Sequence, residues 1–278
     1  MKKQQLVLLG GGIILFCLIY FFGQTIPPKK KSSPVTATDA DTRSILDASR
    51  SNLSPSQQAQ LSQLEAGIVR GDIKEQQIKV YKQIAAFWRD TVHLLVPFSY
   101  YTAEAAKLEN SEKSLTFAAQ QFFGGFQKQE NPELRRWMAL QAKELFERVL
   151  KLNPTNDSAK IQLGSCYIFG NISETPMEGI RMVREVAEKD SQNMYAQHIL
   201  GMGAVFSGQF DKAIERFLIV AQKEPENIEA KLLLAESYER TGDTLNAIKW
   251  YQASLQLLKQ KKEFAQEIEK RINSLKTD

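Results

Sequence analysis

The feature that most constrains this chain is a spacing of small and large apolar residues that returns every 34 residues. Ala213 and Ala247 are 34 residues apart, and Gly208 and Gly242 keep the same interval. A period of this length is typical of a pair of helices that repeats and stacks into an array. Small residues let two helices approach closely, and large residues such as Phe217 fill the space beside them. The period therefore predicts stacked helix pairs over this part of the chain.

Two glycines mark the predicted turns inside the repeated units. Gly208 and Gly242 fall where the first helix of each unit has to end. A residue just past a helix end often adopts left-handed backbone, which glycine tolerates best. We therefore expect left-handed backbone at both glycines.

The pattern resembles the tetratricopeptide repeat over residues 194–261, and more weakly over residues 115–193. A preceding unit begins at Asp157 and has its three extra residues in the turn from Gly170 to Pro176. The resemblance implies an all-α fold, a right-handed superhelix of antiparallel helix pairs. Since no segment alternates like a β-strand, the hydrophobic pattern also favours an all-helical chain.

The amino-terminal residues read as a membrane anchor. Leu6 to Phe22 is a run of 17 residues without a charge, long enough to cross a bilayer core. We therefore expect a transmembrane anchor over residues 1–26, with a cleaved signal peptide as the alternative. Residues 27–54 are rich in Pro, Ser, Thr and Asp, so they predict a disordered linker.

The rest of the chain divides into three predicted parts: a helical region at 55–112 with a possible degenerate repeat, the repeats at 113–262, and a capping helix at 263–278. Ser54 and Pro55 are expected to begin the first helix of this region. Asp72 and Glu75 suggest a capping box at the start of a second helix, and Pro97 is expected to end that second helix. The capping helix carries one apolar stripe, made of Phe264, Ile268, Ile272 and Leu275.

Charge and composition exclude some classes of function. The formal net charge of +4 includes Lys2, Lys3 and the cluster Lys29 to Lys31; the remainder has 31 basic and 32 acidic residues, a net charge of −1. The sequence shows no basic stripe, which is the feature that would indicate nucleic-acid binding. The cluster at Lys29 to Lys31 suits lipid headgroups instead.

No catalytic motif is visible in the sequence. The two histidines, His93 and His198, are far apart and lack the spacing of metal ligands. Cys166, the one cysteine outside the apolar run, is expected to be a buried filler. We therefore expect no enzyme activity, cofactor, metal ion or small-molecule substrate.

The resemblance to tetratricopeptide proteins implies that the first helix of each unit lines a concave groove. The residues expected there to bind a protein or peptide partner are Ile168, Phe169, Tyr195, His198, Met202, Val205, Phe206, Glu236, Glu239 and Arg240. The aliphatic members have core packing as their alternative role. The groove is apolar in the middle and acidic toward its carboxy-terminal end, which favours a partner with large apolar side chains followed by a basic residue.

These observations predict a bacterial scaffold on the cell inner membrane, held by one span, with its soluble domain in the periplasm. A cytoplasmic orientation is the alternative, because lysines flank both sides of the span. The second functional reading is a chaperone-like assembly factor for envelope or cytochrome maturation that holds unfolded clients.

Overall fold

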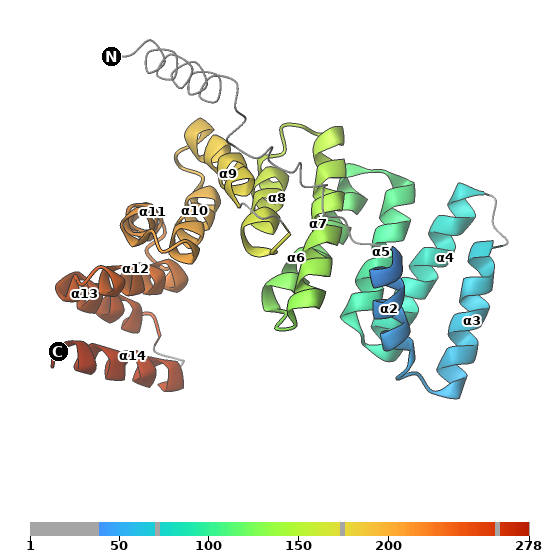
Figure 1. Ribbon diagram of the computed structural model, residues 1–278, viewed down its shortest axis with the longest axis horizontal. Coiled ribbons are helices and arrows are strands. Elements are labelled where there is room, and N and C mark those ends of the chain that lie inside the picture. The colour runs from blue at the N-terminus through green and yellow to red at the C-terminus, as the bar shows by residue number, and fades with distance from the viewer. Residues whose placement is uncertain (1–38, 70–72, 173–175, 259–261, 278) are drawn as a thin grey trace, which may run out of the picture. The chain divides into compact units, whose positions relative to one another are not determined.

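The computed structural model describes residues 39–69, 73–172, 176–258 and 262–277 of the chain, and every regular element in these ranges is helical (Figure 1). The amino-terminal elements are α2 (Asp39–Arg50), α3 (Pro55–Val69), α4 (Lys74–Ala86), the π-helix η1 (Phe87–Val92), α5 (Leu95–Glu109), α6 (Glu112–Lys128) and α7 (Pro132–Leu152). They are followed by α8 (Asp157–Phe169), α9 (Met177–Lys189), α10 (Met194–Phe206), α11 (Phe210–Lys223), α12 (Ile228–Arg240), α13 (Thr244–Leu255) and α14 (Lys262–Leu275).

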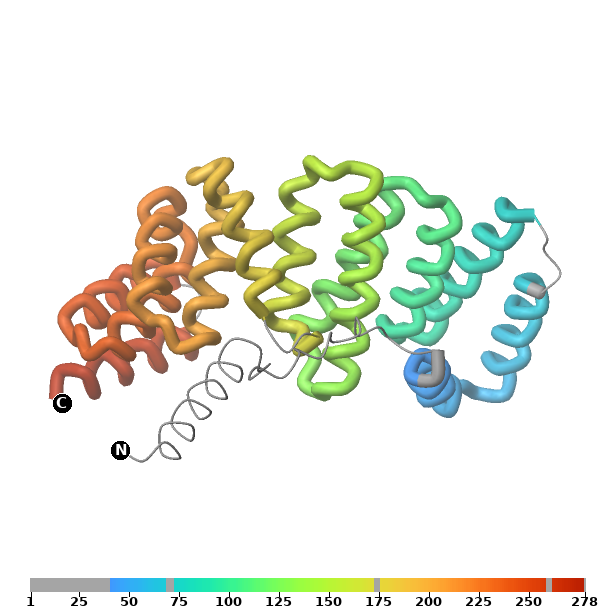
Figure 2. The backbone as a smooth tube through the Cα atoms, turned by 45° about the horizontal axis from the view of Figure 1, so that its top comes forward, coloured from blue at the N-terminus to red at the C-terminus, as the bar shows by residue number. Residues whose placement is uncertain are grey.

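Most of these helices form antiparallel pairs that stack in chain order. The pairs are α4 with α5, α6 with α7, α8 with α9, α10 with α11 and α12 with α13, and each pair packs on the next (Figure 2). Among the first helices, α8 contacts both α6 and α10. The predicted all-helical array of repeated helix pairs is confirmed for the part of the chain that the structure describes.

The first helices of the repeats begin alike because each has an asparagine cap. The side chains of Asn156, Asn193 and Asn227 accept hydrogen bonds from the backbone N–H groups three residues further on, at the starts of α8, α10 and α12. Such a cap contributes about 1 kcal/mol to helix stability. The asparagines therefore help to fix where each repeat begins.

The predicted turn conformations are also confirmed. Gly208 has a φ of +71° and Gly242 a φ of +81°, so both lie in the left-handed region that favours glycine. The turns hold α11 and α13 against the first helices of their own pairs, which buries Phe217 completely.

From α8 to α14 the apolar core forms local clusters that each join neighbouring helices. One cluster joins α8, α9 and α10, the next joins α10, α11 and α12, and the last joins α12, α13 and α14. In the last cluster Ile268, Ile272 and Leu275 of α14 are buried, whereas Phe264 of the predicted stripe is 39% exposed. Cys166 is buried, as expected, and burial raises the pKa of its thiol.

Part of the predicted linker is helical. Residues 39–50 form α2, and Thr42 accepts a hydrogen bond of 3.1 Å from Nε1 of Trp137 on α7. The local composition predicted a linker here because it gives no sign of this tertiary contact between α2 and α7. The predicted anchor at 1–26 and residues 27–38 lie outside the described residues, and the described helices include none that is long and apolar enough to span a membrane.

Two predicted helix boundaries are corrected in the amino-terminal region. The α4 helix begins after Ile73 without a side-chain cap hydrogen bond, and Asp72 of the expected capping box lies outside the described residues. Pro97 does not end this helix, because the chain turns earlier, at His93, whose φ is +61°. Pro97 lies in the first turn of α5, where a missing N–H removes no helical hydrogen bond.

Candidate functional site

A groove of about 700 Å³ runs across the first helices of four neighbouring pairs. Its lining comes from α6, α7, α8, α10, the turn before α12 and the first residues of α12. The lining residues are Phe123, Phe126, Gln127, Arg135, Phe169, Met194, Tyr195, His198, Ile199, Met202, Phe206, Glu224, Asn227 and Glu229. We call this the α10 groove, because α10 contributes most of its lining.

Two aromatic rings form one wall of the α10 groove. Phe169 and Phe206 are the last residues of α8 and α10, and their ring centroids lie 6.1 Å apart at an interplanar angle of 86°. Phe206 is nevertheless 69% exposed. The pair arises because equivalent positions at the ends of successive first helices lie side by side in the array.

The face of α10 toward the groove continues this apolar surface. Tyr195 and Met202 lie seven residues apart, two helical turns, so they share a face with His198 between them. Tyr195 is 37% exposed. Partial burial raises the pKa of its hydroxyl, and a hydrogen bond with Gln162 acts in the opposite direction. Met202 is half-buried and adds a flexible thioether that adapts to different partners.

His198 lies on the groove floor at the boundary between apolar and acidic surroundings. Its ring contacts Phe217 edge-on with centroids 5.6 Å apart, and its Nε2 lies 3.8 Å from a carboxylate oxygen of Glu229. Burial lowers the pKa of His198, and the charges of Glu229 and Glu224 oppose that shift. The ring Nδ1 is buried and makes no hydrogen bond to the described residues.

The charged residues of the α10 groove are unequally distributed. Glu224 and Glu229 lie at the α12 end, and Glu229 is 70% exposed. Arg135 lines the groove from α7, where its Nε donates a hydrogen bond of 2.9 Å to the carbonyl of Gln129. The groove therefore offers carboxylates at one end of an aromatic surface.

Five of the predicted partner-binding residues line this groove together: Phe169, Tyr195, His198, Met202 and Phe206. Ile168 belongs to the core rather than to the groove surface, because its side chain is 4% exposed within the cluster of α8, α9 and α10. Val205 packs partly buried against the next cluster. The alternative role of core packing thus applies to both aliphatic residues.

The predicted acidic end at α12 has a different composition. Glu239 forms an ion pair with Arg271 of α14 and accepts a hydrogen bond of 3.1 Å from the Tyr251 hydroxyl. Arg240 lies over the ring of Phe210 with its guanidinium carbon 4.8 Å from the centroid. These residues and the exposed Glu236 do not line the α10 groove, whose carboxylates are those of Glu224 and Glu229.

The groove also has a wall that the repeat pattern did not predict. Phe123, Phe126 and Gln127 come from the end of α6, and Arg135 comes from the start of α7. The α6–α7 pair lies outside the regular spacing, so no period relates these residues to those of α10. The aromatic residues near the end of α6 were the available signal. Among the described residues, no three His, Cys, Asp or Glu side chains cluster in a way that could hold a metal ion.

Comparison with known proteins supports the repeat assignment for the carboxy-terminal pairs. Residues 200–261 match the family model described as tetratricopeptide repeat, and this match spans most of the α10–α11 pair and the α12–α13 pair. A search of curated proteins found no significant match to the chain.

Several solved structures have a similar helical arrangement. A structure of MamA protein aligns at 18% identity, covering 67% of this chain and 94% of that chain, with a TM-score of 0.49. MamA from Desulfovibrio magneticus RS-1 aligns at 20% identity over 67% and 96% of the two chains, with a TM-score of 0.47. YrrB, described as a TPR protein with an unusual peptide-binding site, aligns at 16% identity over 74% and 97%, with a TM-score of 0.46. Because all three TM-scores are below 0.5, none of these likenesses bears on the partner of this chain.

Proposed function

We propose that this chain is a non-enzymatic scaffold that binds a peptide segment of a partner protein in the α10 groove. The observation that carries the proposal is the exposed aromatic surface made by Phe206 and Phe169. Phe206 is 69% exposed although its ring lies at a groove rather than on a convex surface. Contiguous apolar surface of this kind on a soluble array marks an interaction site.

The chemistry of the lining defines the expected partner segment. A large apolar side chain would contact Phe206, Phe169 and Met202, where it removes apolar surface from water on both sides. A lysine or arginine further along the segment would face Glu224 and Glu229. Charge complementarity of this type selects partners and orients them more than it adds affinity.

Photo-crosslinking in cells tests this function. A photoreactive amino acid is placed at Met202 or Phe206 in the groove, and at Glu215, an exposed residue of α11, as the control. One dominant adduct from the two groove positions, absent from the control position, supports a dedicated scaffold. Many unrelated adducts support the chaperone-like assembly factor instead, and no adduct from a folded protein contradicts both readings.

The scaffold is also proposed to be tethered to the cell inner membrane by residues 1–26, with the helical array in the periplasm. The uncharged run from Leu6 to Phe22 supports the tether. The short segment before this run, with Lys2 and Lys3, supports an amino terminus inside and an array in the periplasm, whereas Lys29 to Lys31 favour the cytoplasmic orientation. Protease added to intact spheroplasts tests the orientation. Digestion of the array without lysis supports the periplasmic location, and protection until lysis supports the cytoplasmic orientation.

A further inference from the structure

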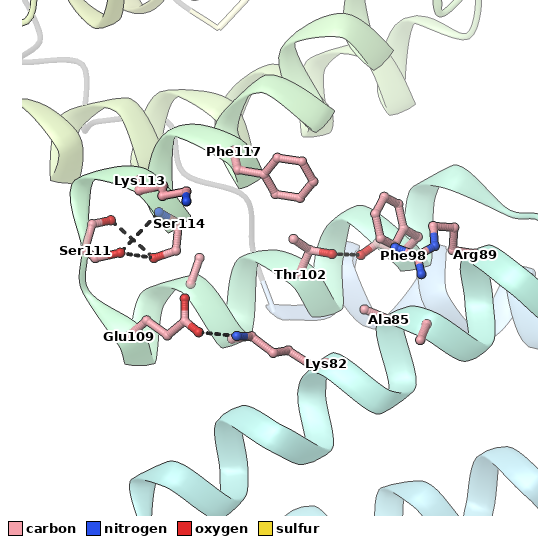
Figure 3. Close-up of a pocket in the computed structure, with 13 residues that line it drawn as sticks. Lys82, Ala85, Arg89, Phe98, Thr102, Glu109, Ser111, Lys113, Ser114 and Phe117 are labelled. Atoms are coloured by element: carbon pink, nitrogen blue, oxygen red, sulfur yellow. Dashed lines mark hydrogen bonds and ion pairs between the residues drawn. The ribbon is translucent and has the colours of Figure 1, made fainter.

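A second cleft lies between α4 and α6, at the opposite end of α6 from the α10 groove. It has a volume of about 510 Å³, and α5 forms its floor because α4 and α6 both pack against that helix (Figure 3). Ala85 on one side and Ala105 and Ala106 below have small side chains, which leave the cleft deep. Phe117 of α6 forms the opposite wall and is 50% exposed.

The polar groups inside this cleft already have partners in the protein. The hydroxyl of Thr102 donates a hydrogen bond of 2.7 Å to the carbonyl of Phe98. Ser111 and Ser114 bond to each other at the start of α6, with 2.7 Å between their hydroxyl oxygens. A sugar or nucleotide would lose its hydrogen bonds to water here without replacement, which is unfavourable. The interior is therefore suited to an apolar group.

The ion pairs at the rim of the cleft leave one lysine uncompensated. Lys82 pairs with Glu109 at 2.5 Å and Arg89 pairs with Asp90 at 2.7 Å, so both of these cations are compensated within the chain. Lys113, at the start of α6, is exposed and has no ion pair with the described residues. A carboxylate carried next to an apolar group would meet this lysine.

We propose that the cleft between α4 and α6 is a second docking site, which takes a large apolar side chain of an acidic peptide segment and places a neighbouring carboxylate against Lys113. The charge preference is opposite to that of the α10 groove, whose end carries Glu224 and Glu229. The chain would thus hold two partner segments of different charge, or two parts of one partner. This inference goes beyond the proposed function and does not depend on it.

Fluorescence anisotropy with two labelled peptides tests this second site on the full 278-residue chain. Both peptides carry paired leucines one helical turn apart; one has flanking glutamates and the other has lysines at the same positions. In the Phe206→Ser variant, which lacks the exposed ring of the α10 groove, we expect the glutamate peptide to bind at least about tenfold more tightly than the lysine peptide, because only the glutamate peptide complements Lys113.

Matched substitutions locate the binding. Phe117→Ser and Lys113→Glu should each weaken the glutamate peptide by about tenfold, whereas Phe206→Ser, an exposed phenylalanine of the α10 groove, should leave its affinity unchanged. Lys113→Glu preserves folding because an acidic residue suits the first turn of a helix. It therefore keeps the test valid even where Phe117→Ser fails to fold.

Three results would overturn the proposal. One is equal binding of the two peptides to the Phe206→Ser variant, or binding of neither. Another is loss of the glutamate peptide in Phe206→Ser rather than in the Phe117 and Lys113 variants. The third is binding of anionic phospholipid vesicles through Lys113 when the glutamate peptide does not bind, which would assign the cleft to a membrane surface instead.

Discussion

Gly201 is the residue at which the ring of Phe217 rests directly on α10. A Cβ added at Gly201 would lie 2.7, 2.8 and 3.0 Å from three ring atoms, and Phe217 is completely buried. We therefore expect Gly201→Ala to lower the free energy of unfolding by about 1–3 kcal/mol, the usual cost of overpacking a core. Urea titration followed by circular dichroism measures this change.

Gly124 provides the matched control for that substitution. It lies inside α6, and a Cβ added there meets nothing within 4 Å. Gly124→Ala should raise the free energy of unfolding by about 0.5–1 kcal/mol, because alanine restricts the unfolded chain more than glycine does. A stabilising effect of both alanines would mean that the contact at Gly201 does not limit side-chain size.

Phe206 and Phe217 separate binding from stability. Phe206→Lys should weaken partner binding while changing the free energy of unfolding by less than about 0.5 kcal/mol, since the ring is exposed. Phe217→Ala should cost about 3–5 kcal/mol, because it opens a cavity in the core. The affinity of both variants for the crosslinked partner tests the effect on binding, and urea titration of both variants tests the effect on stability. Unfolding of Phe206→Lys would place Phe206 in the core and remove it from the site.

His198 should make stability depend on pH. Burial holds its pKa below the ordinary value of 6.5, so between the two values the unfolded chain binds a proton that the folded chain does not. Stability is then fully present above the ordinary pKa and is lost as the pH falls below it. His198→Gln should reduce the loss of stability between about pH 7.5 and pH 5.5, measured by urea titration at each pH.

A control on the other histidine isolates this effect. His93 is exposed and has a φ of +61°, a left-handed conformation that asparagine tolerates better than most residues. His93→Asn therefore removes a histidine without straining the backbone, and it serves as the matched control in the same titrations. An unchanged pH dependence in His198→Gln would show that the carboxylates alone determine it.

Among the helices, α14 covers the last apolar surface of the array. Ile268 and Ile272 are buried against the cluster that includes Tyr251 and Leu258, and a stacked array needs such a cover to remain soluble. Ile272→Asp should undock α14, lower solubility and increase binding of an apolar dye. Glu269→Asp, on the exposed side of α14, is the control. Peptide binding in the α10 groove should persist, since Ile272 lies outside it.

The helices of the repeats could be predicted because their packing is local and recurrent. The small residue Ala213 and the large residue Phe217 have counterparts one period later, so one pattern predicts both turns and both pairs. The bend after α4 could not be predicted, because the π-helix η1 and the left-handed His93 follow no repeated spacing and carry no glycine. The helix α2 was missed because only its position near Trp137 distinguishes it from a linker.

The part of the candidate site that could be predicted is the part formed by residues of the regular 34-residue repeat. Phe169 and Phe206 end equivalent helices, so their proximity follows from the repeat. Arg135 comes from α7, a helix of 21 residues outside the regular register, and no sequence spacing relates it to α10. Glu239 was expected in the groove, but its ion pair with Arg271 joins residues separated by 32 positions. Contacts between neighbouring elements that are about one period apart in the sequence thus decide which charges are available to a partner.

At the scale of the whole array, stability should vary from one pair to the next. The clusters of buried residues described in α3 to α5 and in α8 to α14 each join neighbouring helices. In such arrays the free energy is close to a sum over repeats and their interfaces. A core substitution near one end should therefore destabilise the adjacent pairs and leave remote pairs nearly unchanged. The chain contains 3 tryptophans, which report on separate parts of the array.

The three tryptophans are spread along the array: Trp88 lies in η1, Trp137 in α7 and Trp250 in α13. The substitution to test is Leu234→Ala in α12, because the Leu234 side chain is completely buried. We expect it to remove about 2–5 kcal/mol from the surrounding repeats and to move the urea transition of Trp250 to lower concentration while that of Trp88 stays in place. Fluorescence of variants that each retain one tryptophan measures the transitions separately. If all three tryptophans shift together, the array unfolds as one cooperative unit, and the helix pairs are coupled over a longer range than their local clusters indicate.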